Sequence, residues 1–226
     1  MAKAKNGNEA DAGAGELRFI IIGAGMSAIL SAIKLQQAGF NDVTIYEKAD
    51  RLGGTWRENT YAGISCDVPS HLYCYSFAPN PAWTHRFSPG AEIQAYFEDV
   101  ARRYDVEKLI RYGKEITHCA FENGRWCIAT ADGVADEADI VIAATGVLHH
   151  PAYPDIEGLD SFDGTCFHSA RWDHGVDFAG KRLGVIGTGS SAIQIVAALA
   201  PTAGKLSLFQ RTAQWVMPQE NPAYTE

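Results

Sequence analysis

Two glycine-rich segments have the residue types and the spacing that bind the pyrophosphate of a dinucleotide. They read Gly23-Ala24-Gly25-Met26-Ser27-Ala28 and Gly187-Thr188-Gly189-Ser190-Ser191-Ala192. In each, the first glycine permits a tight turn, the second lets the backbone approach phosphate, and the final alanine lets a helix pack closely on a strand. The phosphates would lie on the unpaired amides at the positive dipole end of that helix.

A charged residue follows each glycine segment at the same distance in the sequence, and its sign predicts the cofactor. Glu47 lies 24 residues beyond Gly23 and can accept hydrogen bonds from ribose hydroxyls, which suits FAD. Arg211, before Thr212, lies 24 residues beyond Gly187 and can pair with a ribose 2′-phosphate, which favours NADPH. A nucleotide-free glycine turn and a solvated Arg211 remain the alternatives. Two such sites imply hydride transfer between two cofactors.

The elements around both segments predict an α/β fold with two Rossmann-like dinucleotide-binding units. Apolar runs predict buried strands, and apolar residues at helical spacing predict helices. We expect strands at 17–22, 43–46, 126–130, 139–143, 182–186 and 205–210, and helices from the first glycine segment to about Gly39, over 91–104, and from the second glycine segment to Ala200. The stretch 51–89 has neither period, but its aromatic residues argue against disorder.

These elements predict four regions. Residues 1–16 form a disordered tail or an expression remnant, and 17–150 form the first part of an FAD-binding domain. A Pro-punctuated linker follows at 151–180, and 181–226 begin an inserted, incomplete NADPH-binding domain.

Composition excludes several function classes. The 226 residues are 46% hydrophobic and 20% charged, as in ordinary globular proteins. A net charge of −8 argues against nucleic acid or an anionic membrane as a partner, and no apolar run approaches the ~20 residues of a membrane span. The cysteines are odd in number and contain no C-x-x-C pair, which predicts a reduced, cytoplasmic protein without a metal site.

The linker has a further pattern, Phe162-x-Gly164-x-x-x-His168-x-x-x-Trp172-Asp173. Together with Gly53-Gly54-Thr55-Trp56, it resembles the class B flavoprotein monooxygenases, most closely the Baeyer–Villiger monooxygenases, over about 17–218. Taken alone, His168 would more often be a structural histidine. The resemblance implies that His168 and Trp172 couple movement of the NADPH domain to the flavin site.

The resemblance also implies roles between the two glycine segments. Gly54, Thr55 and Trp56 would lie at the flavin, and Tyr73 would be a further FAD contact. Ser65-Cys66-Asp67 would form a loop that also meets NADPH, with Asp67 as the catalytic carboxylate that positions an essential arginine. A solvated Asp67 and core-filling Trp56 and Tyr73 are the alternatives.

The reaction that the resemblance implies is a Baeyer–Villiger oxidation. NADPH reduces FAD, O₂ forms a C4a-peroxyflavin, and one oxygen atom is inserted next to a ketone carbonyl to give an ester or lactone. The family continues well beyond Glu226, so we expect a fragment or a truncated product that lacks the arginine. The alternatives are an N- or S-oxidising flavin monooxygenase and a nucleotide-binding module without full activity. A disulfide reductase is disfavoured because Cys66 and Cys74 do not form a redox pair.

The sequence also departs from the family pattern at Arg57-Glu58-Asn59 and at 61–65. These substitutions are expected to alter cofactor contacts or substrate preference. The oligomeric state is not predicted.

Overall fold

The computed structural model describes residues 17–225, which form two compact units. The first unit contains 17–54 and 98–146, and the second contains 55–97 and 147–225. The chain therefore enters each unit twice, and the boundary between 97 and 98 lies inside helix α3 (Gly90–Arg103). The expected tail at 1–16 lies outside the described residues. The division groups 55–97 with the second glycine segment, whereas the domain boundaries expected from the sequence stay predictions.

The first unit is built on a parallel four-stranded sheet. Its strand order is β3 (Ile110–Arg111), β2 (Val43–Tyr46), β1 (Phe19–Ile22) and β7 (Ile140–Ala143). Strand β1 pairs with β2 on one side and with β7 on the other, and its residues are mostly buried, as expected for a central parallel strand. The α/β fold class is confirmed.

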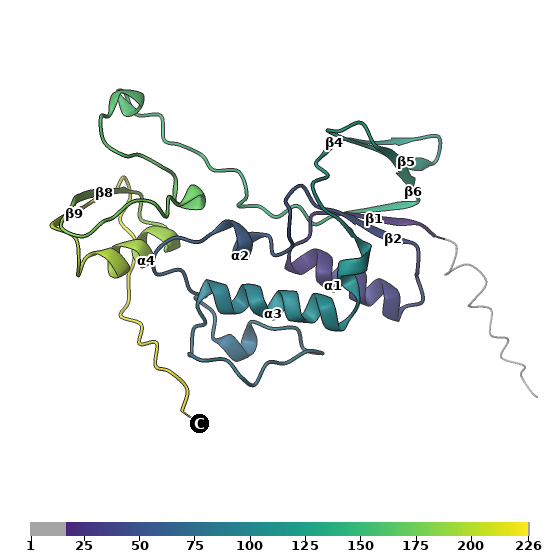
Figure 1. Ribbon diagram of the computed structural model, residues 1–226, viewed down its shortest axis with the longest axis horizontal. Helices are drawn as coiled ribbons and strands as arrows, with labels where there is room; N and C mark the ends of the chain where they lie inside the picture. The colour runs from purple at the N-terminus through teal and green to yellow at the C-terminus, as the bar shows by residue number, and fades with distance from the viewer. Residues whose placement is uncertain (1–16, 226) are drawn as a thin grey trace, which may run out of the picture. The chain divides into compact units, whose positions relative to one another are not determined.

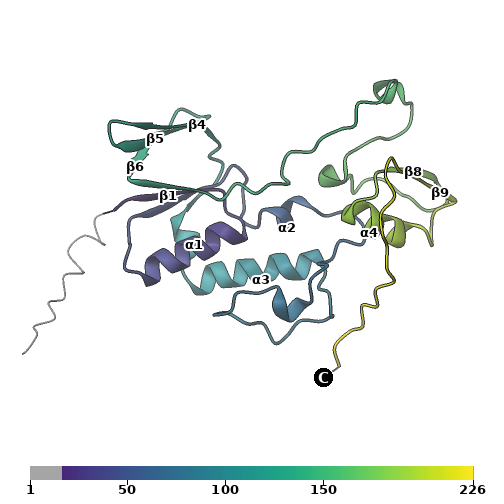
Figure 2. The same cartoon turned by 180° about the vertical axis from the view of Figure 1, so that it is seen from behind.

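Both faces of this sheet are covered. Helix α1 (Met26–Gln37) packs on one face, and the antiparallel sheet of β4 (Ile116–Glu122), β5 (Arg125–Thr130) and β6 (Ala135–Ala138) lies on the other (Figures 1 and 2). Ile20, Tyr46, Ile128 and Ala138 form the buried cluster between the two sheets. Helix α1 ends as predicted, because Gly39 follows it with a φ of +92° that favours glycine.

An ionic network lies at the amino-terminal end of β1. The Arg18 guanidinium contacts Asp42 and Asp136, each at 2.5 Å, and the Tyr46 hydroxyl donates to Asp136 at 2.8 Å. Burial, together with the hydrogen bond to Asp136, raises the pKa of Tyr46 to about 12. Partial burial alone would raise the pKa of Asp136, but the hydrogen bonds from Arg18 and Tyr46 outweigh it and lower that pKa. The network joins β1, β2 and β6.

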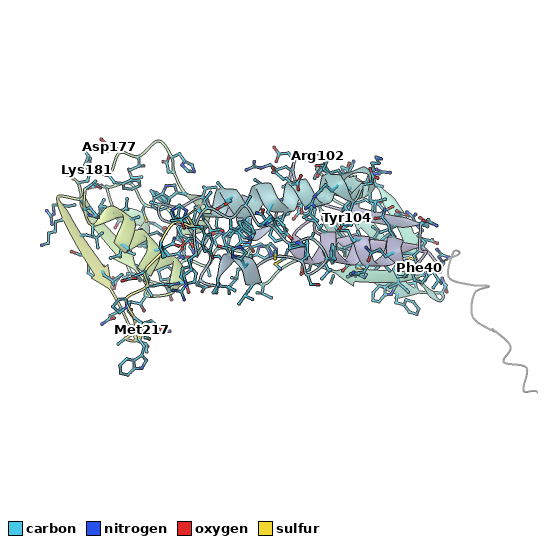
Figure 3. The ribbon with its side chains drawn as sticks, turned by 90° about the horizontal axis from the view of Figure 1, so that it is seen from below. Phe40, Arg102, Tyr104, Asp177, Lys181 and Met217 are labelled. Atoms are coloured by element: carbon cyan, nitrogen blue, oxygen red, sulfur yellow. The ribbon has the colours of Figure 1, made fainter. Side chains whose placement is uncertain are left out.

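The second unit contains the parallel pair β8 (Arg182–Ile186) and β9 (Lys205–Phe209), connected by α4 (Ser190–Leu199). These bounds agree with the expected strand, helix and strand to within one residue. Tyr61, Ile195 and Leu199 form a buried cluster, and the linker residues Trp172 and Phe178 pack against it. Among the residues after β9, Met217 is 84% exposed and projects away from the two strands (Figure 3).

The stretch 55–89 is ordered by aromatic packing although it has only two short helices, α2 (Thr55–Glu58) and a 3₁₀ turn at Ser70–Leu72. The Tyr75 amide donates to the Tyr96 hydroxyl at 2.8 Å, and that hydroxyl donates to the Ala78 carbonyl at 2.8 Å. The rings of Trp83 and Phe97 flank Tyr96. The expectation that its aromatic residues order this segment is confirmed.

Residues 221–224 form a strap that adds a short antiparallel segment to 84–87. The Asn221 side chain accepts from the Phe87 amide at 2.8 Å and donates to the Phe87 carbonyl at 3.0 Å. His85 and Ala223 form an antiparallel bridge, and the Tyr224 hydroxyl lies 3.1 Å from His71 Nδ1. The strap thereby orders a loop that is distant from it in the sequence.

No helix in 17–225 is long and apolar enough to cross a membrane.

Candidate functional site

The first glycine segment lies where the strand order of the sheet reverses. The chain leaves β1 toward β2, and β7 lies on the opposite side of β1, so the carboxyl ends of these strands form the crevice where open α/β sheets bind ligands. Gly23 forms the turn there with a φ of +96°, and its amide donates to the Tyr46 carbonyl at 2.7 Å. A Cβ on Gly23 would lie 2.6 Å from the Ala144 carbonyl oxygen, so only glycine fits.

Gly25 and Gly54 bring two backbone segments into contact beside the start of α1. A Cβ on Gly54 would lie 3.0 Å from the Gly25 Cα, and the Gly53 amide donates to the Ala24 carbonyl at 3.0 Å. Within the described chain, no side chain caps the amino terminus of α1 at Gly25. Bare backbone and an uncapped helix terminus are the features that fit a pyrophosphate group.

Glu47 is almost completely buried, with 4% of its surface exposed. One carboxylate oxygen accepts from the Ala24 amide at 2.7 Å, and the other accepts from the Ala49 amide at 2.9 Å. The side chain therefore fastens the end of β2 to the glycine turn. The sequence did not reveal this structural role. Its role as a ribose ligand stays a prediction, and each carboxylate oxygen can accept more than one hydrogen bond.

The second glycine segment repeats the backbone of the first. Gly187 has a φ of +110°, and its amide donates to the Phe209 carbonyl at 2.9 Å, just as Gly23 donates to Tyr46. Gly189 stands at the amino terminus of α4, where no side chain within 17–225 provides a cap. A Cβ on Gly187 or Gly189 would meet no described atom within 4 Å.

The equal sequence spacing suggested that Arg211 is equivalent to Glu47, and the strand registers correct this. Ile22 pairs with Tyr46 in the first unit, and Ile186 pairs with Phe209 in the second. Gln210 therefore stands where Glu47 stands, and Arg211 lies one residue further, because the second connection is one residue shorter. Arg211 is exposed. Arg211 stays a candidate ligand of the 2′-phosphate because of its positive charge and its position just beyond β9.

Trp56 and Tyr73 contact each other in the second unit. The Trp56 indole Nε1 donates to the Tyr73 hydroxyl at 3.1 Å, and the rings meet edge to face with centroids 5.6 Å apart. Burial raises the pKa of Tyr73, although the hydrogen bond from Trp56 opposes the shift. Both rings are half-buried, so neither is a simple core-filling side chain.

The segment Ser65-Cys66-Asp67 is anchored at its centre and open at its end. The Cys66 amide donates to the Ser88 carbonyl at 2.9 Å, and the side chain is buried, which raises the pKa of its thiol. The next residue, Asp67, is exposed. The structure thus presents this carboxylate on a fixed loop, as a catalytic or positioning role requires.

Gln194 is a residue that sequence reasoning missed. Its side-chain nitrogen donates to the Ser65 carbonyl at 2.9 Å, and its side-chain oxygen accepts from the Tyr61 hydroxyl at 3.1 Å and from the Ser65 amide at 3.4 Å. It lies two residues after the second glycine segment, on α4, but a glutamine at a helix position carries no signal of a long-range contact.

The fixed residues of the linker pattern each have a local structural role. His168 Nδ1 accepts from the Ala170 amide at 3.0 Å and caps the 3₁₀ turn Ser169–Arg171. Trp172 packs against the buried cluster of Tyr61, Ile195 and Leu199. The Phe162 ring lies over Gly164, where an added Cβ would be 2.4 Å from it, so a side chain at Gly164 would require this exposed ring to move. The coupling role of His168 and Trp172 stays a prediction.

The departure at Arg57-Glu58-Asn59 forms contacts inside the second unit. Glu58 pairs with Arg57 at 2.6 Å and with the linker residue Arg171 at 3.1 Å, so it joins α2 to the linker. The Asn59 side chain donates to the Thr55 carbonyl at 2.9 Å.

The expected cofactor residues fall on both units. The first unit holds Gly23, Gly25, Ser27, Ala28, Glu47 and Gly54. The second holds the remaining FAD residues, Thr55, Trp56, Asp67 and Tyr73, and all residues expected at NADPH: Ser65, Cys66, Asp67, Gly187, Thr188, Gly189, Ser190, Ser191, Ala192, Arg211 and Thr212. The loop with Asp67 and the second glycine segment therefore belong to one compact unit.

Comparison with known proteins places the chain among flavoprotein monooxygenases. It is 56% identical to an uncharacterised monooxygenase of Mycobacterium tuberculosis, covering 91% of the chain and 42% of the relative. It is 48% identical to a Baeyer–Villiger monooxygenase of Streptomyces coelicolor, covering 92% and 40%. A cyclohexanone monooxygenase from Rhodococcus, solved with bound NADP⁺, matches with a TM-score of 0.85 at 37% identity, covering 92% and 40%.

The chain thus spans about two fifths of the length of these relatives. The resemblance to Baeyer–Villiger monooxygenases inferred from the sequence is confirmed. The model of one family, described as "Flavin-binding monooxygenase-like", matches residues 16–223. The chain belongs to the flavin-binding monooxygenase-like family.

Proposed function

We propose that the protein containing this chain is an FAD- and NADPH-dependent monooxygenase that inserts one oxygen atom of O₂ next to a ketone carbonyl. The product would be an ester or lactone. One observation carries the proposal: the chain holds two strand–glycine–helix turns of the same backbone form, each closed by a hydrogen bond from the first glycine to the second strand. The linker pattern between them and the names of the relatives support the Baeyer–Villiger reaction class.

The first turn is the proposed FAD site. Gly23, Gly25 and Gly54 provide backbone that the pyrophosphate can approach, and the uncapped end of α1 provides amides for it. Glu47 is held in place by two amides, and its carboxylate is a hydrogen-bond acceptor of the kind that ribose hydroxyls require. Bound FAD would supply the transfer of electrons from NADPH to O₂.

The second turn is the proposed NADPH site. The amides at the start of α4 would bind its pyrophosphate, and the exposed Arg211 would pair with its 2′-phosphate. Asp67, on its anchored loop, would hold a cation close to the reacting oxygen. A cation there would stabilise negative charge that develops on that oxygen in a site from which water is excluded.

The test is a product assay on the complete gene product that contains this chain, with NADPH, O₂ and cyclohexanone. We expect lactone formation equal to NADPH consumption. Asp67→Ala should retain stoichiometric FAD, measured by absorbance near 450 nm, and lose lactone formation. Asp160→Ala removes a carboxylate from the same unit, in the exposed turn Leu159–Ser161, and should behave as the wild type.

One outcome would overturn the role of Asp67, and another would overturn the reaction class. Wild-type lactone yield from Asp67→Ala would remove Asp67 from the reaction. Sulfoxide formation from a thioether with no lactone from any ketone would instead indicate an N- or S-oxidising monooxygenase.

A further inference from the structure

The helix of the second glycine segment is in direct backbone contact with the loop that leads to Asp67. Gly63 has a φ of +79°, and a Cβ there would lie 2.7 Å from the Gln194 carbonyl oxygen and 2.9 Å from the Ala198 Cβ. Any larger residue would force the two segments apart. Residues 61–65 and α4 therefore form one packed contact inside the second unit.

The Gln194 side chain closes this contact with directional hydrogen bonds. Its nitrogen donates to the Ser65 carbonyl, and its oxygen accepts from the Ser65 amide, so the side-chain amide pairs with both backbone polar groups of one residue, as a residue on a neighbouring strand would. The same oxygen accepts from the Tyr61 hydroxyl. Ser65 precedes the buried Cys66 and the exposed Asp67, so the bonds hold the loop just before the candidate carboxylate.

The first glycine segment shows that dinucleotide-binding geometry does not require this glutamine. Gln194 lies seven residues beyond Gly187, and the residue seven beyond Gly23 is Leu30, which is 37% exposed on α1. The turn and the helix start have the same backbone form in both copies. The amide of Gln194 therefore serves the loop and not the phosphate turn.

We propose that Gln194 is a positioning residue that couples dinucleotide binding at α4 to the order of the Ser65-Cys66-Asp67 loop. Gln194 lies one helical turn from Ser190, where the pyrophosphate would rest, and a helix of this length moves as a rigid element. Fixing the amino end of α4 would then restrain the loop, and a restrained loop would favour dinucleotide binding by the same factor. The part of this inference that concerns dinucleotide binding rests on the proposed function.

Hydrogen–deuterium exchange on the chain tests two claims separately. The first is that the Gln194 side chain holds the loop 63–67 (the tether), and the second is that dinucleotide binding orders this loop further through Gln194 (the coupling). Without ligand, the amides of 63–67 should exchange about tenfold faster in Gln194→Ala, because hydrogen bonds that hold the loop are lost. Gln36→Ala makes the same change on α1 of the first unit and should leave 63–67 unchanged. With NADP⁺, the wild type should gain protection at 63–67. Gln194→Ala should bind NADP⁺ within about threefold of wild type, but without that added protection.

Each failure points to a different claim. Equal exchange at 63–67 in wild type and Gln194→Ala would overturn the tether. NADP⁺ binding to wild type without any change at 63–67 would overturn the coupling. Absence of NADP⁺ binding to wild type would count against the proposed function and the coupling together, while the ligand-free rates would still decide the tether.

A milder variant keeps the test valid if Gln194→Ala does not fold. Gln194→Glu is nearly isosteric and keeps the acceptor for Tyr61 and for the Ser65 amide, but it loses the donor to the Ser65 carbonyl. Exchange at 63–67 should then be faster than in wild type, and wild-type rates would contradict the tether.

Discussion

The two glycine turns have the same backbone form but differ in what surrounds them. Around Gly23, a neighbouring strand, a second glycine pair and a buried carboxylate fix every segment of the turn. Around Gly187, no described atom would meet an added Cβ within 4 Å, and the residue in register with Glu47 is the exposed Gln210. The first turn is held by packing and the second mainly by its own backbone.

This difference shows that one sequence pattern can be required for two physical reasons. Gly23 is needed both for its positive φ and because a side chain would collide with Ala144. Among residues 17–225 no atom would collide with a side chain at Gly187, so within this part of the chain its positive φ is what favours glycine. Tolerance to substitution should therefore differ between positions that the pattern treats as identical.

The largest expected effect separates the two glycines. Gly23→Ala should destabilise its unit by about 3 kcal/mol or more and abolish FAD binding, because strain at positive φ adds to a backbone collision. Gly187→Ala should cost only about 1 kcal/mol, from strain alone. Urea denaturation of both variants measures the loss of unfolding free energy, and flavin titration measures the loss of FAD binding. Equal losses would mean that the surroundings of the turn do not matter.

The next effect concerns the buried carboxylate. Glu47→Gln keeps one acceptor but turns an NH₂ group toward a backbone amide, so it should cost about 2 kcal/mol of unfolding free energy. The matched change Gln210→Glu, at the exposed position in the same register, should stay within about 0.5 kcal/mol. Denaturation midpoints decide the matter, and a neutral Glu47→Gln would show that the carboxylate does not support the turn.

A smaller effect tests the charge of the second turn. Arg211→Ala should weaken NADP⁺ binding about tenfold and leave NAD⁺ binding unchanged, because one charge-assisted contact to the 2′-phosphate is lost. Arg182→Ala removes an exposed arginine at the opposite end of the β8–β9 pair and is the control. Calorimetric titration with both nucleotides provides the comparison. Parallel loss for NADP⁺ and NAD⁺ would argue against a 2′-phosphate contact.

The smallest effect lies at the amino-terminal edge of the first unit. The lowered pKa of Asp136 means that its contacts with Arg18 and Tyr46 add stability above its unfolded pKa of about 3.9, and that this stability is lost as the pH falls through the lower folded value. Asp136→Asn should therefore reduce stability at pH 7 by less than about 1 kcal/mol. In denaturation experiments from pH 7 to pH 2, the stabilities of the two proteins should converge as the pH falls below the folded pKa of Asp136. A constant gap would show that protonation of Asp136 is not responsible.

The sequence predicted the elements whose pattern is strong and local. Apolar runs predicted β1, β2, β8 and β9, of which β1 and β8 end in glycine turns, and the helices α1 and α4 were predicted to within a few residues. The short strand β3 and the strands β4 and β6 were not predicted. β3 has two residues, and most residues of β4 are exposed, so neither shows the apolar pattern of a buried strand.

The sequence predicted which residue types lie at the candidate site better than it predicted their contacts. Counting residues made Arg211 equivalent to Glu47, whereas the registers show Gln210 in that place, because connection length is not visible in a spacing rule. The bonds of Gln194 and the capping by His168 depend on tertiary placement, which no local pattern encodes.

The strap between Asn221 and Phe87 imposes an order in time as the protein is made. The two partners are 134 residues apart in the chain, so the segment around Phe87 must wait for its partner during synthesis. At a usual translation rate of about 5–20 residues per second this delay is roughly 7–27 s. During that time the backbone groups of 84–87 lack these partners, and an unpaired edge of this kind can pair with another chain.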